Sequence, residues 1–207
     1  MRGRRLTTVT AVAAALAIGQ LITTQLELTG EDTPPYLRHA DTGEVSRLVY
    51  ADVEVTDVRA AKQLAPEIST ALARIAGGVF VLVSVTLTAT REPIGFETAY
   101  LVDDRGRQYR ASIKSTCDPN PRSDTGLPTY ALFCFDVPTD VLAGLHFRTG
   151  RGSPILDATR GDDVADIDLD ISPSEAKDWA ATSDVYLVES ASLEPFELQT
   201  VELSEIP

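Results

Sequence analysis

The valine-rich segment over residues 79–89 constrains the fold of this chain more than any other run of residues. One side of an extended chain would carry Val79, Val81, Val83, Val85 and Leu87. β-Branched side chains at every second position are typical of a β-strand. We therefore expect this run to form a strand in the centre of a sheet.

Shorter runs on both sides of that segment also show strand patterns. Alternating apolar and polar residues predict strands over residues 48–58, 145–148 and 164–171. Further strands are expected over 98–102 and 108–112, and over the apolar run 130–137. Between two of them, Gly106 can take the positive φ that a hairpin turn requires. Short strands with regular turn signals predict an all-β fold, an antiparallel β-sandwich.

Two short helices are expected besides the strands. Ser172 is suited to cap a helix that has Pro173 at its first position, Glu175 in its first turn and its end near Ala180. Apolar residues at helical spacing favour another short helix over 67–76, although Pro66 also permits a long irregular connection.

The N-terminus has the pattern of a membrane-targeting segment. Arg2, Arg4 and Arg5 precede 21 uncharged residues, 6–26, and a helix of that length spans about 30 Å. Two interpretations stay open: residues 1–28 form a membrane-spanning signal anchor, or a signal peptide is cleaved before Gln20. The basic start predicts a single-pass membrane protein with its C-terminal domain outside the cytoplasm, and cleavage would make it secreted.

These features divide the chain into four parts. Residues 1–28 are the signal anchor or signal peptide, 29–46 a polar linker, 47–171 the sandwich and 172–207 an acidic C-terminal extension. The linker contains Pro34 and Pro35 and is expected to be a flexible spacer. The length after the N-terminal segment suits one domain.

The chain has two cysteines, Cys117 and Cys134. Outside the cytoplasm such a pair is typical of a disulfide, and the alternative is two buried free thiols. With only His39 and His146 as further soft ligands, no zinc site or other cofactor is expected.

The charge of the chain is concentrated near its C-terminus. The whole sequence has a net charge of −13, and residues 157–207 hold 14 acidic residues against Arg160 and Lys177. Such a surface repels nucleic acid and attracts cations or a basic partner. The extension over 193–207 either folds back onto a basic hairpin or stays in solvent, and the hairpin cations are Arg105, Arg107, Arg110 and Lys114.

Two sets of side chains are candidate sites. A cation such as Ca²⁺ needs several oxygen ligands, which one strand and the turn before it supply as Asp162, Asp163, Asp166, Asp168 and Asp170. The alternative is a solvated strand face. Aromatic residues of the extension are candidate interface anchors or packing residues: Trp179, Tyr186 and Phe196.

Three stretches together resemble a known family: residues 78–85 (GVFVLVSV), 101–109 (LVDDRGRQY) and 135–138 (FDVP). They are similar to the immunoglobulin-like domains of bacterial extracytoplasmic proteins and lipoproteins of the immunoprotective-extracellular-protein type. The resemblance spans about residues 47–171 and implies an immunoglobulin-like sandwich outside the cytoplasm, with no shared catalytic activity. The chain departs from the family in lacking a lipoprotein cysteine, in an insert over 59–76 and in its acidic extension.

The sequence holds no Gly-x-Ser-x-Gly motif, phosphate-binding loop or metal-ligand motif, so no catalytic residues are expected. We expect a non-enzymatic, membrane-anchored extracytoplasmic binding or accessory module that recognises a protein or an envelope component. The alternatives are a calcium- or carbohydrate-dependent adhesion module and an unrecognised hydrolase.

Overall fold

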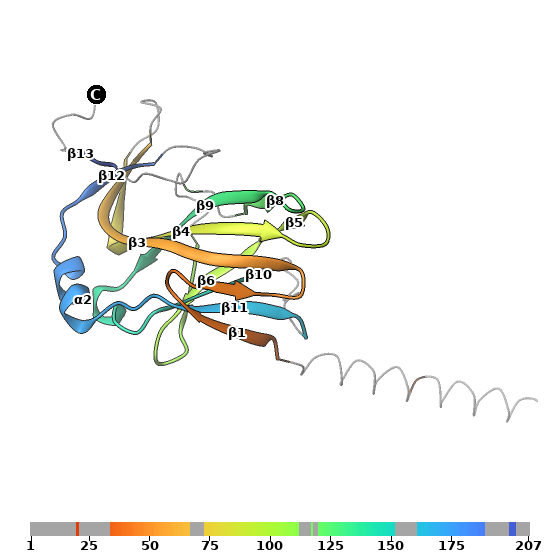
Figure 1. The fold of residues 1–207 in the computed structure, drawn as a ribbon. Helices are drawn as coiled ribbons and strands as arrows, with labels where there is room; N and C mark the ends of the chain where they lie inside the picture. Colours follow the sequence, from red (N-terminus) through yellow and green to blue (C-terminus); the bar gives the residue numbers. More distant parts are fainter. Residues whose placement is uncertain are drawn as a thin grey trace, which may run out of the picture.

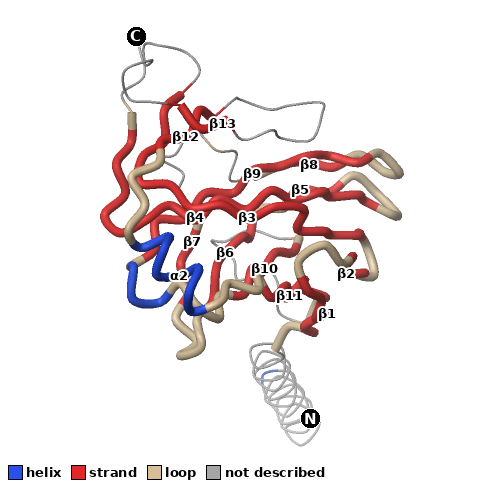
Figure 2. The backbone as a smooth tube through the Cα atoms, turned by 60° about the vertical axis from the view of Figure 1, so that its left-hand side comes forward, coloured by secondary structure: helices blue, strands red, loops and turns tan. Residues whose placement is uncertain are grey.

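The computed structural model of the chain describes residues 34–66, 73–111, 120–151, 161–188 and 199–201, together with Gln20 and Cys117. Strands dominate these residues and pack in two layers, so the predicted all-β sandwich is confirmed (Figures 1 and 2). Within this described part, no helix is both long enough and apolar enough to cross a membrane. The segment 1–28 lies outside the described residues, except for Gln20.

The lower layer in Figure 1 is a five-stranded sheet, which we call sheet A. Its strand order is β1 (Tyr36–Asp41), β11 (Asp163–Asp168), β10 (His146–Gly150), β6 (Thr98–Val102) and β7 (Gln108–Arg110). β1 and β11 run parallel, and the other neighbours are antiparallel. The predicted hairpin joins β6 to β7, and Gly106 has a φ of 75° in its turn.

The second layer is a six-stranded sheet, sheet B. It runs in the order β13 (Gln199–Val201), β12 (Val185–Val188), β3 (Ala51–Pro66), β4 (Arg74–Ala89) and β9 (Pro128–Val137), and β2 (Val45–Arg47) pairs with β3. β12 and β3 are parallel. A small separate sheet is formed by β5 (Ile94–Gly95) and β8 (Arg122–Ser123), and a 3-10 turn, η1, follows β9 (Thr139–Val141).

The main hydrophobic core lies between the two sheets. Sheet B contributes the predicted face of β4, in which all five residues are buried: Val79, Val81, Val83, Val85 and Leu87. Sheet A contributes Leu101, Phe147 and Ile167. The ring of Phe147 lies 5.4 Å from that of Phe133 and 6.1 Å from that of Phe135, centroid to centroid. Burying a side chain of this size stabilises the fold by about 1.5–3 kcal/mol.

A second hydrophobic cluster covers the outer face of sheet B. It contains Phe80 and Leu82 of β4, Leu132 of β9, and Tyr186 of β12. Both faces of β4 are therefore buried, which accounts for a run of residues with hardly a charged or strongly polar side chain.

Residues 36–41 and 45–47 are strands, so the prediction of a flexible polar linker over 29–46 is wrong there. The polar side chains of β1 have partners that the sequence pattern did not suggest. Arg38 pairs with Asp163, and His39 lies against Asp166, both from the parallel neighbour β11.

The predicted helix over 67–76 is also wrong at its end, because residues 74–76 belong to β4. Residues 67–72 lie outside the described part. β3 and β4 are each 16 residues long and continue past the sandwich, where β3 bends towards β12 (Figure 1).

The prediction that neighbouring strands run antiparallel fails for two pairs, β1 with β11 and β12 with β3. The strands of each pair are far apart in the sequence, and no hairpin signal joins them.

A bulge interrupts the pairing of β3 and β4 where the two strands leave the sandwich. Lys62 Nζ donates to the carbonyl oxygens of Ala76 (3.0 Å) and Gly78 (2.8 Å). The Asp136 carboxylate accepts from the amides of Gly77 (3.0 Å) and Gly78 (3.1 Å). The Lys62 ammonium group thus binds carbonyl oxygens that the strand pairing leaves free at the bulge, and the Asp136 carboxylate binds the free amides.

The C-terminal helix α2 (Pro173–Ala180) forms as predicted, and Ser172 Oγ accepts the Glu175 amide at 3.2 Å. After it, β12 joins sheet B, so residues 185–188 are part of the sandwich sheet rather than of a separate extension. Residues 189–198 and 202–207 lie outside the described part.

Candidate functional site

The outer face of sheet A carries a polar row that crosses all five strands. One residue from each strand is in register: His39, Asp166, Arg148, Tyr100 and Arg110. The adjacent residues Leu101, Phe147 and Ile167 face the core. Since successive side chains alternate between faces, the row points away from the core. We call it the sheet A row.

Asp166 is the centre of this row and is 2% exposed. Arg148 donates to both of its oxygens, with Nε 2.7 Å from Oδ1 and Nη2 3.3 Å from Oδ2. A buried carboxylate is costly unless a cation and hydrogen bonds compensate for its lost hydration. The two-point contact with Arg148 supplies both.

The only two histidines of the chain lie against the same carboxylate. His39 Nδ1 is 3.0 Å from Asp166 Oδ2, and His146 Nδ1 is 3.6 Å from Asp166 Oδ1. The His39 side chain is 70% exposed, so a ligand on this face can reach it. When protonated, each imidazole forms an ion pair with Asp166.

The sequence interpretation missed this cluster, because its members come from β1, β10 and β11. The sequence places His39 in the predicted linker and His146 in the predicted strand over 145–148. The alternation of β10 and β11 does place His146, Arg148 and Asp166 on outward positions, and that pattern was the one available signal. The pairing of the two strands could not be obtained from it.

Replacing Arg148 with methionine is expected to destabilise the fold by about 2 kcal/mol, because the buried Asp166 loses its permanent cation. The value is below that of a fully buried pair because Arg148 is 23% exposed. Urea unfolding measures it. The double variant Arg148→Met, Asp166→Leu should be more stable than Arg148→Met alone, and a double variant less stable than that single variant would contradict the role of the pair.

The five aspartates of the predicted cation site do not converge. Asp166 was expected on a solvated face if it bound no cation, but it is buried against Arg148. Asp162 accepts from Arg151 Nε at 2.5 Å. In the residues that the structure describes, no three or more His, Cys, Asp or Glu side chains are grouped to hold a metal ion.

The remaining three aspartates have further separate contacts. The buried Asp163 binds the Arg38 guanidinium (3.0 Å) and the Val49 amide (2.9 Å). Asp168 Oδ1 accepts the amide of Asp170 at 2.9 Å. Asp170 follows the end of β11 with a φ of 51°, and partial burial together with nearby carboxylates raises its pKa.

The aromatic interface candidates are packing residues where they are described. Tyr186 is 7% exposed and belongs to the second hydrophobic cluster, so it is not a surface anchor. Trp179 is partly buried and packs against the main core. Phe196 lies outside the described residues.

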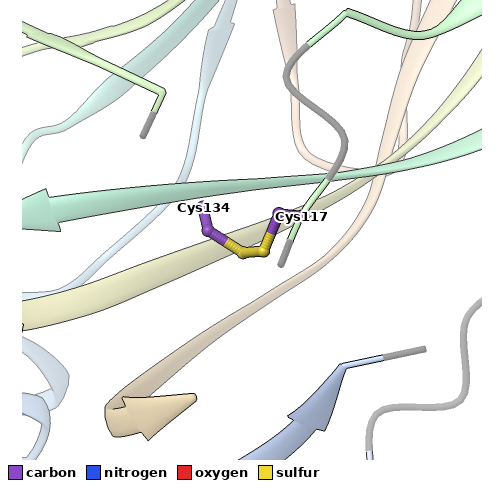
Figure 3. The surroundings of a disulfide bond; sticks show 2 residues. All are labelled: Cys117 and Cys134. Atoms are coloured by element: carbon purple, nitrogen blue, oxygen red, sulfur yellow. A yellow bond between two sulfur atoms is a disulfide. The ribbon is translucent and has the colours of Figure 1, made fainter. Parts of the chain in front are cut away.

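Cys117 and Cys134 form a disulfide, as predicted, with their Cα atoms 6.0 Å apart (Figure 3). Both residues are buried in the second hydrophobic cluster. The bond therefore ties the segment that follows β7 onto the outer face of β9, away from the sheet A row.

The hairpin between β6 and β7 is organised by Asp103. Its Oδ1 accepts the amides of Arg105 and Arg107, both at 2.9 Å, and its Oδ2 accepts Arg107 Nε at 2.6 Å and the Tyr109 hydroxyl at 3.1 Å. Desolvation opposes ionisation of this carboxyl. The hydrogen bonds from Arg107, Arg105 and Tyr109 outweigh it and lower the pKa of Asp103 to about 2.

The effect of Asp103 on stability should therefore depend on pH. Its pKa is lower in the folded chain than the ordinary value of 3.8, so its stabilisation is complete above pH 3.8 and is lost as the pH falls through 2. Asp103→Asn should be less stable than the wild type at neutral pH, and the difference should shrink steadily below pH 3.8. Urea midpoints measured between pH 2 and pH 7 test this, and a constant difference would contradict it.

The acidic extension does not reach this hairpin in its described part. β12 and β13 extend sheet B, whereas β6 and β7 belong to sheet A. Arg107 is already paired within the hairpin. Lys114 and residues 202–207 lie outside the described part, so docking of the extension onto the hairpin stays a prediction.

No family model and no curated protein matches the sequence of this chain. Its structure is similar to that of the yjhA protein from Bacillus subtilis, at 14% identity, a TM-score of 0.45 and coverage of 62% of this chain and 99% of that chain.

Two further solved structures are similar at the same distant level. One is described as an uncharacterized beta-sandwich protein from Clostridium difficile, at 10% identity, a TM-score of 0.35 and coverage of 64% and 95% of the two chains. The other is a conserved hypothetical protein from Bacillus anthracis, at 12% identity, a TM-score of 0.37 and coverage of 53% and 87%. Likeness of this degree carries no information on function.

Proposed function

We propose that the chain is a non-enzymatic binding module, anchored through its N-terminal segment, that holds an immunoglobulin-like sandwich outside the cytoplasm and recognises a protein or an envelope component. The sheet A row is the observation that supports this function best. It presents charges of both signs on an outer sheet face, and the paired Asp166 and Arg148 hold it in place.

The geometry of the row suits a large partner. His39 and Arg110 are exposed at its two ends, and strands fix their spacing. Arginine, tyrosine and histidine on a broad, rigid surface match the polar rim and anchor groups of protein recognition sites. The disulfide supports the extracytoplasmic location, because such bonds persist in oxidising compartments.

A matched pair of variants tests this function. The full-length chain is cross-linked in its native membrane and purified as the wild type, as Arg110→Ser and as Arg122→Ser. Both arginines are exposed strand residues, but Arg122 lies on β8, outside sheet A. We expect recovery of the partner to fall about tenfold with Arg110→Ser, a loss of about 1.4 kcal/mol, and to stay unchanged with Arg122→Ser. Equal recovery from the two variants would reject the row as the recognition surface.

The calcium-dependent alternative makes a different prediction. Millimolar Ca²⁺ would raise the melting temperature of an adhesion module that binds it through the aspartates of β11. Since Asp162, Asp163 and Asp166 are each engaged by an arginine, we expect no such rise.

A further inference from the structure

One end of the sandwich differs from the rest of its surface. It holds three of the five large hydrophobic side chains that are exposed in the described residues: Tyr36 (59%), Val49 (51%) and Leu127 (60%). Two exposed arginines, Arg47 and Arg91, lie at the same end and pair with no carboxylate in the part of the chain that the structure describes. We call these five residues the proximal end.

Contacts between neighbouring turns bring these residues together. Tyr36 is paired in register with Asp163, whose carboxylate accepts the Val49 amide. The carbonyl of Tyr50, the next residue, accepts the amide of Thr90, which precedes Arg91.

The Leu127 turn joins the same group. Its neighbour Gly126 donates to the carbonyl of Ala89, the last residue of β4, at 2.8 Å. Figure 1 shows the start of β1 and the turn after β4 towards one side of the molecule, with β12, β13 and the C-terminus on the other.

The proximal end is also where the N-terminal segment would hold the domain. Seven residues, 29–35, separate segment 1–28 from the first residue of β1, and they reach at most about 25 Å. The 16 residues of β4 extend over about 50 Å. A tether half as long as β4 leaves Tyr36 and its neighbours as the part of the domain next to the bilayer.

The chemistry of this end fits a lipid surface. Tyrosine with aliphatic side chains on turns suits the boundary between headgroups and acyl chains, and arginine binds lipid phosphate. Carboxylates lie at the same end, since Asp52 is paired in register with Arg47, and the Asp124 carbonyl accepts the Leu127 amide.

In contrast, α2 and the turn before β12 carry Glu175, Asp178 and Asp184 on the opposite side of the molecule (Figure 1). Asp162 and Asp163 lie at the proximal end, but they pair with Arg151 and Arg38.

We infer that the proximal end rests on the headgroup layer of the bilayer that holds the N-terminal segment, so that the side that carries α2 points away from the membrane. This inference rests on the anchor of the proposed function. The occupant of the surface is lipid, and the seven-residue tether and the exposed aromatic and aliphatic side chains are what favour it over a protein.

Hydrogen exchange of the full-length chain in lipid nanodiscs of phosphatidylcholine and phosphatidylglycerol tests the inference. Amides of the turns at 90–92 and 124–127 should exchange about tenfold more slowly in the wild type than in Val49→Asp, Leu127→Asp, a change that corresponds to about 1.4 kcal/mol. The turn at 181–184, at the opposite end, is the internal reference. Ile75→Asp changes the exposed apolar residue beyond the sandwich and should leave the rates at the proximal end unchanged.

The other outcomes separate this inference from the proposed anchor. A chain that co-elutes with the nanodiscs and shows equal rates in the wild type and the double aspartate variant keeps the anchor and overturns the lipid contact. A chain that does not co-elute removes the anchor, and the inference falls with it. Protection that requires added membrane proteins assigns the surface to a protein and overturns the lipid assignment.

Discussion

Gly78→Ala is expected to destabilise the sandwich by about 3 kcal/mol or more, near the upper limit for an overpacked site. A Cβ atom at this position would overlap the carbonyl oxygen of Val137 and lie 3.0 Å from the Cα atom of Pro138. These are backbone atoms at the end of the neighbouring strand β9, so no side-chain rotation relieves the overlap. β4 and β9 would have to separate where the bulge begins. Urea unfolding of the full chain measures the loss.

The neighbouring Gly77 provides the control for that variant. A Cβ atom there would meet only the Asp136 carboxylate, at 3.4 Å, which is an ordinary van der Waals contact. Gly77→Ala should therefore change the unfolding free energy by less than about 1 kcal/mol. Similar losses for the two alanine variants would contradict the close approach of β4 and β9 at Gly78.

Loss of the disulfide should have the next largest effect, about 3 kcal/mol. Cys117 and Cys134 are 17 residues apart, and their bond limits the freedom of the unfolded chain. Cys117→Ala, Cys134→Ala removes it permanently, and reduction of the wild type under denaturing conditions removes it without changing a side chain. The alanine double variant and the reduced wild type should have the same urea midpoint. Both midpoints should lie below that of the oxidised chain. An oxidised chain no more stable than the reduced one would show that the bond does not stabilise this fold.

Local patterns were sufficient to predict much of the sandwich. The central strand β4, the β6–β7 hairpin with Gly106 and the capped helix after Ser172 each follow from neighbouring residues. The core face of β11 also follows, since its alternation buries Ala165 and Ile167.

Features that depend on distant residues were not predictable. β1 reads as a polar linker because its stability comes from parallel pairing with β11, more than a hundred residues later. The start of β4 reads as a helix because the bulge beside it depends on Lys62 and Asp136, which lie on the two flanking strands.

The candidate site shows the same limit most clearly. Asp166 follows the alternation of a solvated strand face, and by itself it resembles its neighbours Asp168 and Asp170. Its burial depends on Arg148 and on His39, and these come from two other strands. A periodic pattern locates the face of a residue but not the charge that lies opposite.

The proposed function requires the sandwich to lie outside the cytoplasm with its disulfide closed. The most direct test is the state of Cys117 and Cys134 in cells that make the protein naturally. Cells are quenched in acid, free thiols are alkylated under denaturing conditions, and the chain is analysed by mass spectrometry before and after reduction. We expect no alkylated cysteine before reduction and two after it. Two alkylated cysteines before reduction would place the domain in a reducing compartment and contradict the account.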